Sequence, residues 1–166
     1  MLGWRRVIRL ASSVLAWSAA ACGGDGDPGP CNGVGDPAIE LRERNADVLL
    51  VDGSELPIFP PPQGGVWTEI DVRLLGIAAA DVESIRVDVL DESGAPVGAE
   101  LYLGEGLPLA CRTDGSIEID NMPVQLGDLS ALEQLDGVAA TMTTTLAHAD
   151  GDVVLTLAVT LRAEAF

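Results

Sequence analysis

The sequence predicts an all-β domain, an antiparallel β-sandwich of the immunoglobulin-like type with seven or eight strands. Two observations support this prediction: apolar and polar residues alternate with a period of two in several runs after Ala38, and glycine-containing turn pairs separate the runs. The turn pairs are Asp52-Gly53, Ser93-Gly94, Asp114-Gly115 and Asp150-Gly151. They supply the backbone conformations that tight turns need, and short strands at this spacing favour a sandwich over a barrel.

The strands are expected in the following order along the chain. Short strands are predicted at residues 39–41, 48–51 and 100–103, and alternating runs mark further strands at residues 66–74, 84–89 and 117–120. The clearest pattern is a C-terminal hairpin of residues 141–148 and 152–164, in which every second residue from Val153 to Leu161 is apolar. Helix is expected only at residues 128–135, where Asp128 can cap one or two turns.

Composition and charge limit the partners. The chain has 166 residues, 48% of them apolar, and its 9 Lys+Arg against 26 Asp+Glu give a formal net charge of -17. Such a surface repels phosphates, so neither nucleic acid nor an anionic membrane surface is expected as a partner. The length suits one domain, and no cofactor is expected.

The first 21 residues have the pattern of an export signal. Arg5, Arg6 and Arg9 form a cationic start, and a mostly apolar run of signal-peptide length follows, too short to cross a bilayer. The run ends in Ala19-Ala20-Ala21-Cys22, which resembles the lipobox of bacterial lipoproteins, although Ala19 stands where that family usually has Leu. The resemblance implies cleavage before Cys22 and diacylglyceryl and acyl chains on it. Ordinary secretory cleavage and an uncleaved helix are the alternatives.

Residues 22–37 are expected to form a tether and residues 38–166 the sandwich. The tether is rich in Gly, Asp and Pro and has almost no apolar side chains to bury. With Cys22 acylated, Cys31 and Cys111 remain as an even pair in an exported chain, which predicts a disulfide. On the chain-entropy description it would stabilise the fold by about 4–5 kcal/mol. Two free or metal-binding thiols are the alternative.

Several segments resemble a group of uncharacterised lipoproteins from high-GC Gram-negative bacteria, over roughly residues 22–90. The matching parts are Cys22 with its spacer, Asp36-Pro37-Ala38-Ile39-Glu40-Leu41, Asp52-Gly53 before Leu56-Pro57-Ile58, and Pro62-Gln63-Gly64-Gly65 before Val66-Trp67. The resemblance implies a lipid-anchored location, with the outer membrane or cell surface favoured, and no activity.

No catalytic residue is predicted. His148 is the one imidazole, and no nucleophile motif accompanies it, so an exposed hairpin histidine is expected. The tether aspartates lack the ordered ligand positions of a calcium loop. Weak divalent-cation binding is considered at Asp150 and Asp152, beside the hairpin turn.

The stretch from Leu56 to Gly65 contains three consecutive prolines and is the most unusual segment of the chain. A rigid crossing between strands, with Phe59 on the core, is the expected role, and a recognition segment is the alternative. Trp67 falls on the wet face by alternation, either as an anchor for a partner or covered by the preceding loop. Phe59 and Trp67 are therefore the candidate partner-binding residues.

These observations predict a lipid-anchored, non-catalytic binding, adhesion or accessory module that engages a protein or glycan at the cell envelope. A structural acidic envelope protein with weak cation binding is the first alternative. A carboxylate-dependent hydrolase is the second, although sugar clefts usually need more stacking aromatics than the 4% of this chain.

Overall fold

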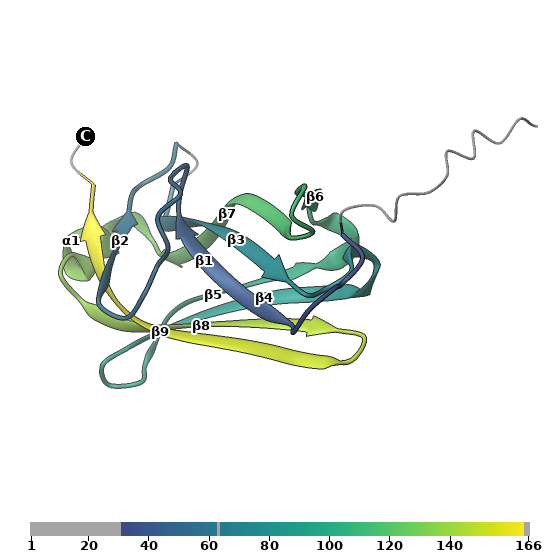
Figure 1. Cartoon of the computed structure of the whole chain (residues 1–166). Coiled ribbons are helices and arrows are strands. Elements are labelled where there is room, and N and C mark those ends of the chain that lie inside the picture. The colour runs from purple at the N-terminus through teal and green to yellow at the C-terminus, as the bar shows by residue number, and fades with distance from the viewer. Residues whose placement is uncertain (1–30, 63, 165–166) are drawn as a thin grey trace, which may run out of the picture.

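Two stacked β-sheets make up the computed structural model, which describes residues 31–62 and 64–164 (Figure 1). The predicted signal peptide, Cys22 and the first part of the tether lie outside the described residues. Within the described ranges, no helix has the length and apolarity to cross a membrane.

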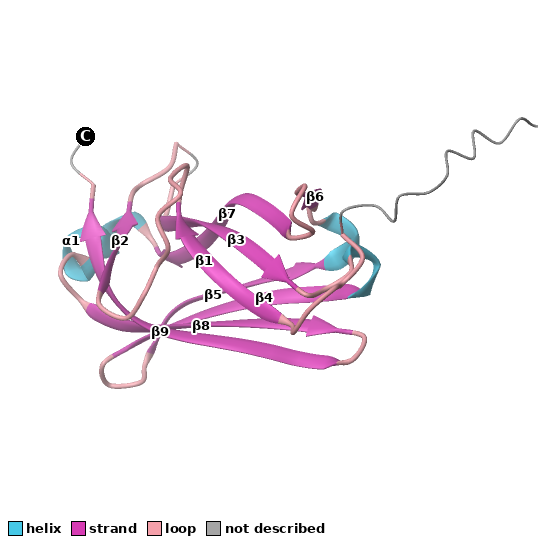
Figure 2. Cartoon of the chain, viewed as in Figure 1, coloured by secondary structure: helices cyan, strands magenta, loops and turns pink. Residues whose placement is uncertain are grey.

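The described residues form nine strands, more than the seven or eight predicted, with a few short helical turns, and Figure 2 shows that strands dominate. In chain order the strands are β1 (Ala38–Glu43), β2 (Ser54–Ile58), β3 (Val66–Leu75), β4 (Val82–Asp91), β5 (Pro96–Leu103), β6 (Ala110–Cys111), β7 (Ile117–Gly127), β8 (Ala139–His148) and β9 (Gly151–Ala163). The helical turns are η1 (Ala79–Asp81), η2 (Gly104–Gly106), η3 (Leu129–Ala131) and α1 (Leu132–Leu135). The side chain of Asp128 accepts a hydrogen bond from the Ser130 amide, so the predicted cap is confirmed.

The strand order identifies the fold. One sheet has four strands in the order β1-β3-β7-β6, and the other has five in the order β2-β9-β8-β4-β5. This is the arrangement of an immunoglobulin domain, in which strands A, B, E and D face strands G, F and C with an added C′ strand. The first strand is split between the sheets as β1 and β2, so β2 pairs with β9 in parallel while the other ladders are antiparallel. The predicted immunoglobulin-like sandwich is confirmed.

The prediction was wrong at residues 48–51. This segment makes only a single bridge, Arg42 to Leu49, and the second half of the first strand lies further on, in β2. Pro57 obscured that strand in the sequence, since proline cannot donate to a ladder. β2 is an edge strand, where a missing donor is tolerated, and the neighbouring Leu56 and Ile58 are almost completely buried.

The core between the sheets is aliphatic. Ile70, Val72 and Leu74 of β3 and Met142 and Leu146 of β8 are fully buried, and for β3 this is what the alternation predicts. The described aromatic residues Phe59, Trp67 and Tyr102 are only half-buried. Burial raises the pKa of Tyr102 to about 12, and its hydroxyl donates to the Pro123 carbonyl, which joins β5 to β7.

Two threonine hydroxyls in the core, those of Thr68 and Thr144, are buried without a hydrogen-bond partner. A buried hydroxyl that loses its water and gains no partner destabilises the fold. Valine has nearly the same shape and no polar atom. We therefore expect Thr144→Val to raise the free energy of unfolding by about 1 kcal/mol, measured by urea denaturation.

Thr143→Val is the matched control, because the hydroxyl of Thr143 lies on the outer face at 3.2 Å from the Thr156 hydroxyl. This variant should change stability by less than about 0.5 kcal/mol. A loss of stability in Thr144→Val would show that its hydroxyl has a partner in solution.

Candidate functional site

The two aromatic residues singled out in the sequence face each other across one bridge. The Phe59 amide donates to the Trp67 carbonyl at 2.9 Å, and the Trp67 amide donates back to the Phe59 carbonyl at 3.0 Å. The proline-rich loop between them therefore closes as a hairpin. The Trp67 indole N–H donates to the Gly64 carbonyl at 2.9 Å, so this half-buried side chain already uses its polar atom within the loop. Of the two alternatives for Trp67, the structure shows the loop packed against it.

Phe59 lies in the wall of a pocket at the end of the sandwich where the described chain finishes. Figure 1 shows β2 and the end of β9 side by side there, and the Glu164 amide donates to the Ile58 carbonyl at 3.0 Å. The pocket is built from segments far apart in sequence: the end of β1 with the turn after it, β2, β3 and the residue after β9. Its lining residues are Glu43, Arg44, Asn45, Pro57, Phe59, Glu69 and Glu164.

The pocket is acidic around one aromatic ring. Three glutamates line it against a single arginine. The Arg44 guanidinium lies 5.3 Å from the centre of the Phe59 ring and 2.8 Å from a carboxylate oxygen of Glu69, so that cation is held within the wall. Glu43 and Glu164 remain as further negative charges beside the ring. A cationic side chain with an apolar stem fits this combination of charge and ring better than an anion does.

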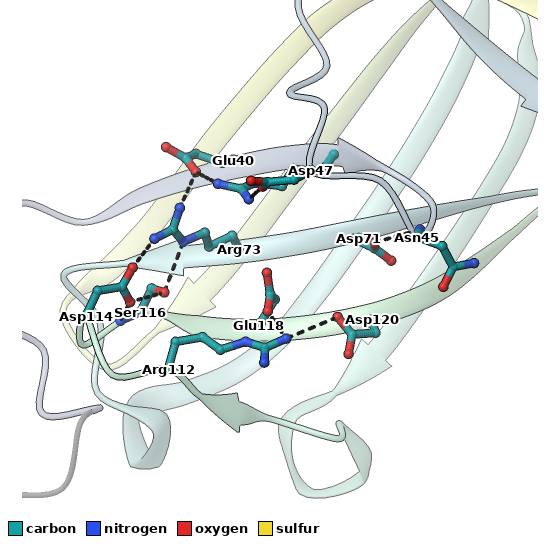
Figure 3. Close-up of polar contacts among 11 residues, drawn as sticks. Glu40, Asn45, Asp47, Asp71, Arg73, Arg112, Asp114, Ser116, Glu118 and Asp120 are labelled. Carbon is teal, nitrogen blue, oxygen red and sulfur yellow. Dashed lines mark hydrogen bonds and ion pairs between the residues drawn. The ribbon is translucent and has the colours of Figure 1, made fainter.

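The outer face of the four-stranded sheet carries most of the arginines of the described chain, and each is ion-paired. Figure 3 shows the Arg73 guanidinium between Glu40 and Asp114, with its Nε donating to the Ser116 hydroxyl at 3.0 Å. Arg112 pairs with Glu118 in the same way. Glu40 lies directly opposite Arg73 in the ladder of β1 with β3, so the strand register sets that pair. Arg112, Asp114 and Ser116 instead come from the turn between β6 and β7.

Asp71 braces this face from within. It is only 9% exposed, and its two carboxylate oxygens accept backbone N–H groups of Asn45 at 3.0 Å and Asn121 at 2.7 Å. Both asparagines have positive φ, 54° and 53°. Asp71 therefore fixes the turn after β1, which supplies Arg44 and Asn45 to the pocket, and the bend in β7.

Cys31 and Cys111 are joined by a disulfide, with Cα atoms 5.5 Å apart, as their pairing in the sequence predicts. The bond links the start of the described chain to β6 at the edge of the four-stranded sheet. Immunoglobulin domains of antibodies instead join their two sheets through a disulfide between strands B and F. Here the corresponding strands, β3 and β8, meet through aliphatic side chains.

The remaining candidates lie at the opposite end, in the turn between β8 and β9. The Asp150 amide donates to Nδ1 of His148 at 3.4 Å, and Asp150 and Asp152 are exposed. The hairpin is confirmed, but His148 is half-buried where an exposed histidine was expected. In the ranges the structure describes, no group of three or more His, Cys, Asp or Glu side chains is arranged to hold a metal ion.

No family model matches the chain, and no curated protein does. Among solved structures, an engineered protein with a 1.98 Å crystal structure is 20% identical over 76% of this chain, with a TM-score of 0.42. The CooA pilin subunit from enterotoxigenic Escherichia coli is 10% identical over 76% of this chain and 99% of its own, with a TM-score of 0.38. The chain spans 20% of the engineered protein. The class of the domain, an immunoglobulin-like sandwich, follows from its own strand order.

Asp114 gives the ion-paired face a measurable pH dependence. Hydrogen bonds from the Ser116 hydroxyl and amide, with the charge of Arg73 nearby, lower the pKa of Asp114 from 3.8 to about 2. A carboxyl whose pKa is depressed in the folded state adds stability above its unfolded pKa and loses it as the pH falls through the folded value. We expect Asp114→Asn to be less stable than the wild type at pH 6, with a difference that narrows between about pH 4 and pH 2.

Urea denaturation at several pH values measures the free energies of unfolding of Asp114→Asn and the wild type. Glu92→Gln, in the turn between β4 and β5, is the matched control for the loss of one exposed carboxylate. A difference between Asp114→Asn and the wild type that persisted undiminished at pH 2 would contradict the role of the ionised carboxylate.

Proposed function

We propose that the protein is an exported, lipid-anchored binding module of the cell envelope that acts without chemistry of its own. The observation that carries the proposal is the disulfide between Cys31 and Cys111, since such bonds persist in oxidising compartments outside the cytosol. Cys31 lies within the Gly/Asp/Pro-rich tether, which follows a signal-like segment that ends just before Cys22. The expected location is the outer membrane or the cell surface.

The partner of this module is a protein or glycan, and we propose that it docks at the pocket beside Phe59. Support comes from the ring, the excess of glutamates over arginine in the lining, and the convergence of four separate segments on one rigid end of the sandwich. A protein partner that presents Lys or Arg side chains has the charge that such a pocket attracts. An acidic surface steers basic partners toward it and repels nucleic acid.

The anchor is tested by the intact mass of the native protein extracted from membranes. We expect the mass of residues 22–166 plus the diacylglyceryl group and one further acyl chain, and a gain of two hydrogen atoms when the disulfide is reduced. Changing Cys22 to Ser should abolish the lipid mass, because the thiol that accepts the diacylglyceryl group is lost. A native mass without lipid, or free thiols before reduction, would overturn the proposal.

The docking site is tested by affinity capture from envelope extracts with the folded protein immobilised. We expect Phe59→Ala and Glu43→Gln each to lower recovery of the captured protein by at least about tenfold, as for a central interface residue. Val34→Ala is the control, because Val34 is an exposed apolar side chain, 82% accessible, near Cys31 and outside the lining of the pocket. Thermal melts verify that each variant is folded. Equal recovery with all three variants would exclude the pocket as the docking site.

A further inference from the structure

The centre of the outer face of the five-stranded sheet differs from the rest of the surface, because one ion pair supplies its only charges. Asp152 and the Glu55–Arg162 pair lie further out on the same face. Its central rows run across β9, β8, β4 and β5 through paired residues. One row contains Val154, Thr145, Arg86 and Leu101, and the next contains Thr156, Thr143, Asp88 and Ala99. In a chain of net charge -17 this small, mostly neutral face is the exception.

The only charges in these two rows neutralise each other. Arg86 and Asp88 form a two-bond ion pair, with Nε to Oδ2 at 2.6 Å and Nη2 to Oδ1 at 2.7 Å. Around them stand threonines and alanines of β8 and β9. Large apolar side chains are exposed at both margins: Val154 at 58% on β9, and Leu101 at 53% and Leu103 at 66% on β5.

We infer that this face binds a second copy of the same chain, sheet against sheet, about a two-fold axis that runs along the strands between β8 and β4. Rotation about that axis places β9 of one copy against β5 of the other. Each row of residues then faces the same row of the second copy. Val154 then meets Leu101 of the second copy, and the same contact repeats on the other side of the axis. The exposed apolar side chains of β9 and β5 thus cover each other in two equivalent contacts, as the symmetry of an isologous interface requires.

Charge complementarity supports the same occupant. The axis places the Arg86–Asp88 pair opposite Thr145 and Thr143 of the second copy, whose hydroxyls can accept from the guanidinium and donate to the carboxylate. No carboxylate meets a carboxylate in these two rows, whereas the opposite sheet would bring its acidic face against itself. Two copies of an acidic chain therefore approach most favourably through this face.

The size and direction of the face also suit a dimer. Four strands at about 4.8 Å spacing, each about ten residues at 3.3 Å rise, span roughly 600 Å² in projection, the order of the roughly 800 Å² that each partner buries in a stable interface. The described chain begins at Cys31, at one end of the sandwich (Figure 1). An axis along the strands sends both N-terminal ends out on the same side, so both can lead to one membrane.

The test is cross-linking of the full chain in native membranes with a short bismaleimide, because facing sheets lie about 10 Å apart. The double variant Leu101→Cys/Val154→Cys should yield a covalent dimer joined between position 101 of one copy and position 154 of the other. Each single variant is the matched control and should give no covalent dimer, since its two thiols would lie at least three strand spacings, roughly 14 Å, apart across the face. The pair Glu69→Cys/Glu118→Cys, on the other sheet, should also give no covalent dimer.

Adding Thr145→Arg to the double variant should lower the cross-linked fraction by at least about tenfold, because it sets a third charge at the centre of the interface. Thermal melts confirm that all variants are folded. Absence of a dimer in the double variant, equal cross-linking of the single variants, or a product whose mass shows a different protein on this face would overturn the inference. These results are independent of whether the Phe59 pocket binds its partner.

Discussion

Burial of branched aliphatic side chains between two sheets is the constraint on which the rest of the molecule depends. Neither an inter-sheet disulfide nor a core tryptophan fastens β3 to β8, so their contact rests on shape and on the exclusion of water. Every second residue of the long strands is committed to that purpose. Function is thereby confined to the outer faces, the sheet edges and the loops at the two ends.

The two outer faces use this freedom differently. On the four-stranded sheet, arginines and carboxylates alternate across the ladders, and Asp71 holds two left-handed asparagines in place. On the five-stranded sheet, short neutral side chains of β8 and β9 lie beside a single ion pair, and exposed Val154 and Leu101 flank them. The charged side chains of the four-stranded sheet are therefore already paired with one another. The outer face of the five-stranded sheet has few charged groups that would lose water on contact, which suits it to bind another surface.

The periodicity of the sequence was sufficient for the fold class, because alternation in 66–74 or 153–161 reports directly on which side of a sheet is buried. The periodicity failed at β2, because proline is disfavoured within strands. Pro57 is tolerated there only because β2 lies at the edge of its sheet. The pairing of Cys31 with Cys111 could be predicted because these two cysteines remain once Cys22 is assigned to the lipid.

The pocket could not be predicted as a whole. Phe59 was singled out, but Glu43, Glu69 and Glu164 come together only through strand order and register, which a single sequence does not specify. The same holds for the two amides that reach Asp71.

The position of the disulfide has a mechanical consequence. Cys31 and Cys111 close a covalent ring that spans a sequence separation of 80 residues and contains β1 to β5. When the domain is stretched between its two ends, the load passes from Cys31 straight into β6, and the ring adds no length even if its strands come apart. About 270 Å of extended chain is withheld in this way. Within the domain, only the chain after Cys111 can lengthen under load. Its strands β7 to β9 are paired along most of their length, which resists that extension. Under tension the domain therefore extends little, because the disulfide prevents more than half of the described chain from lengthening.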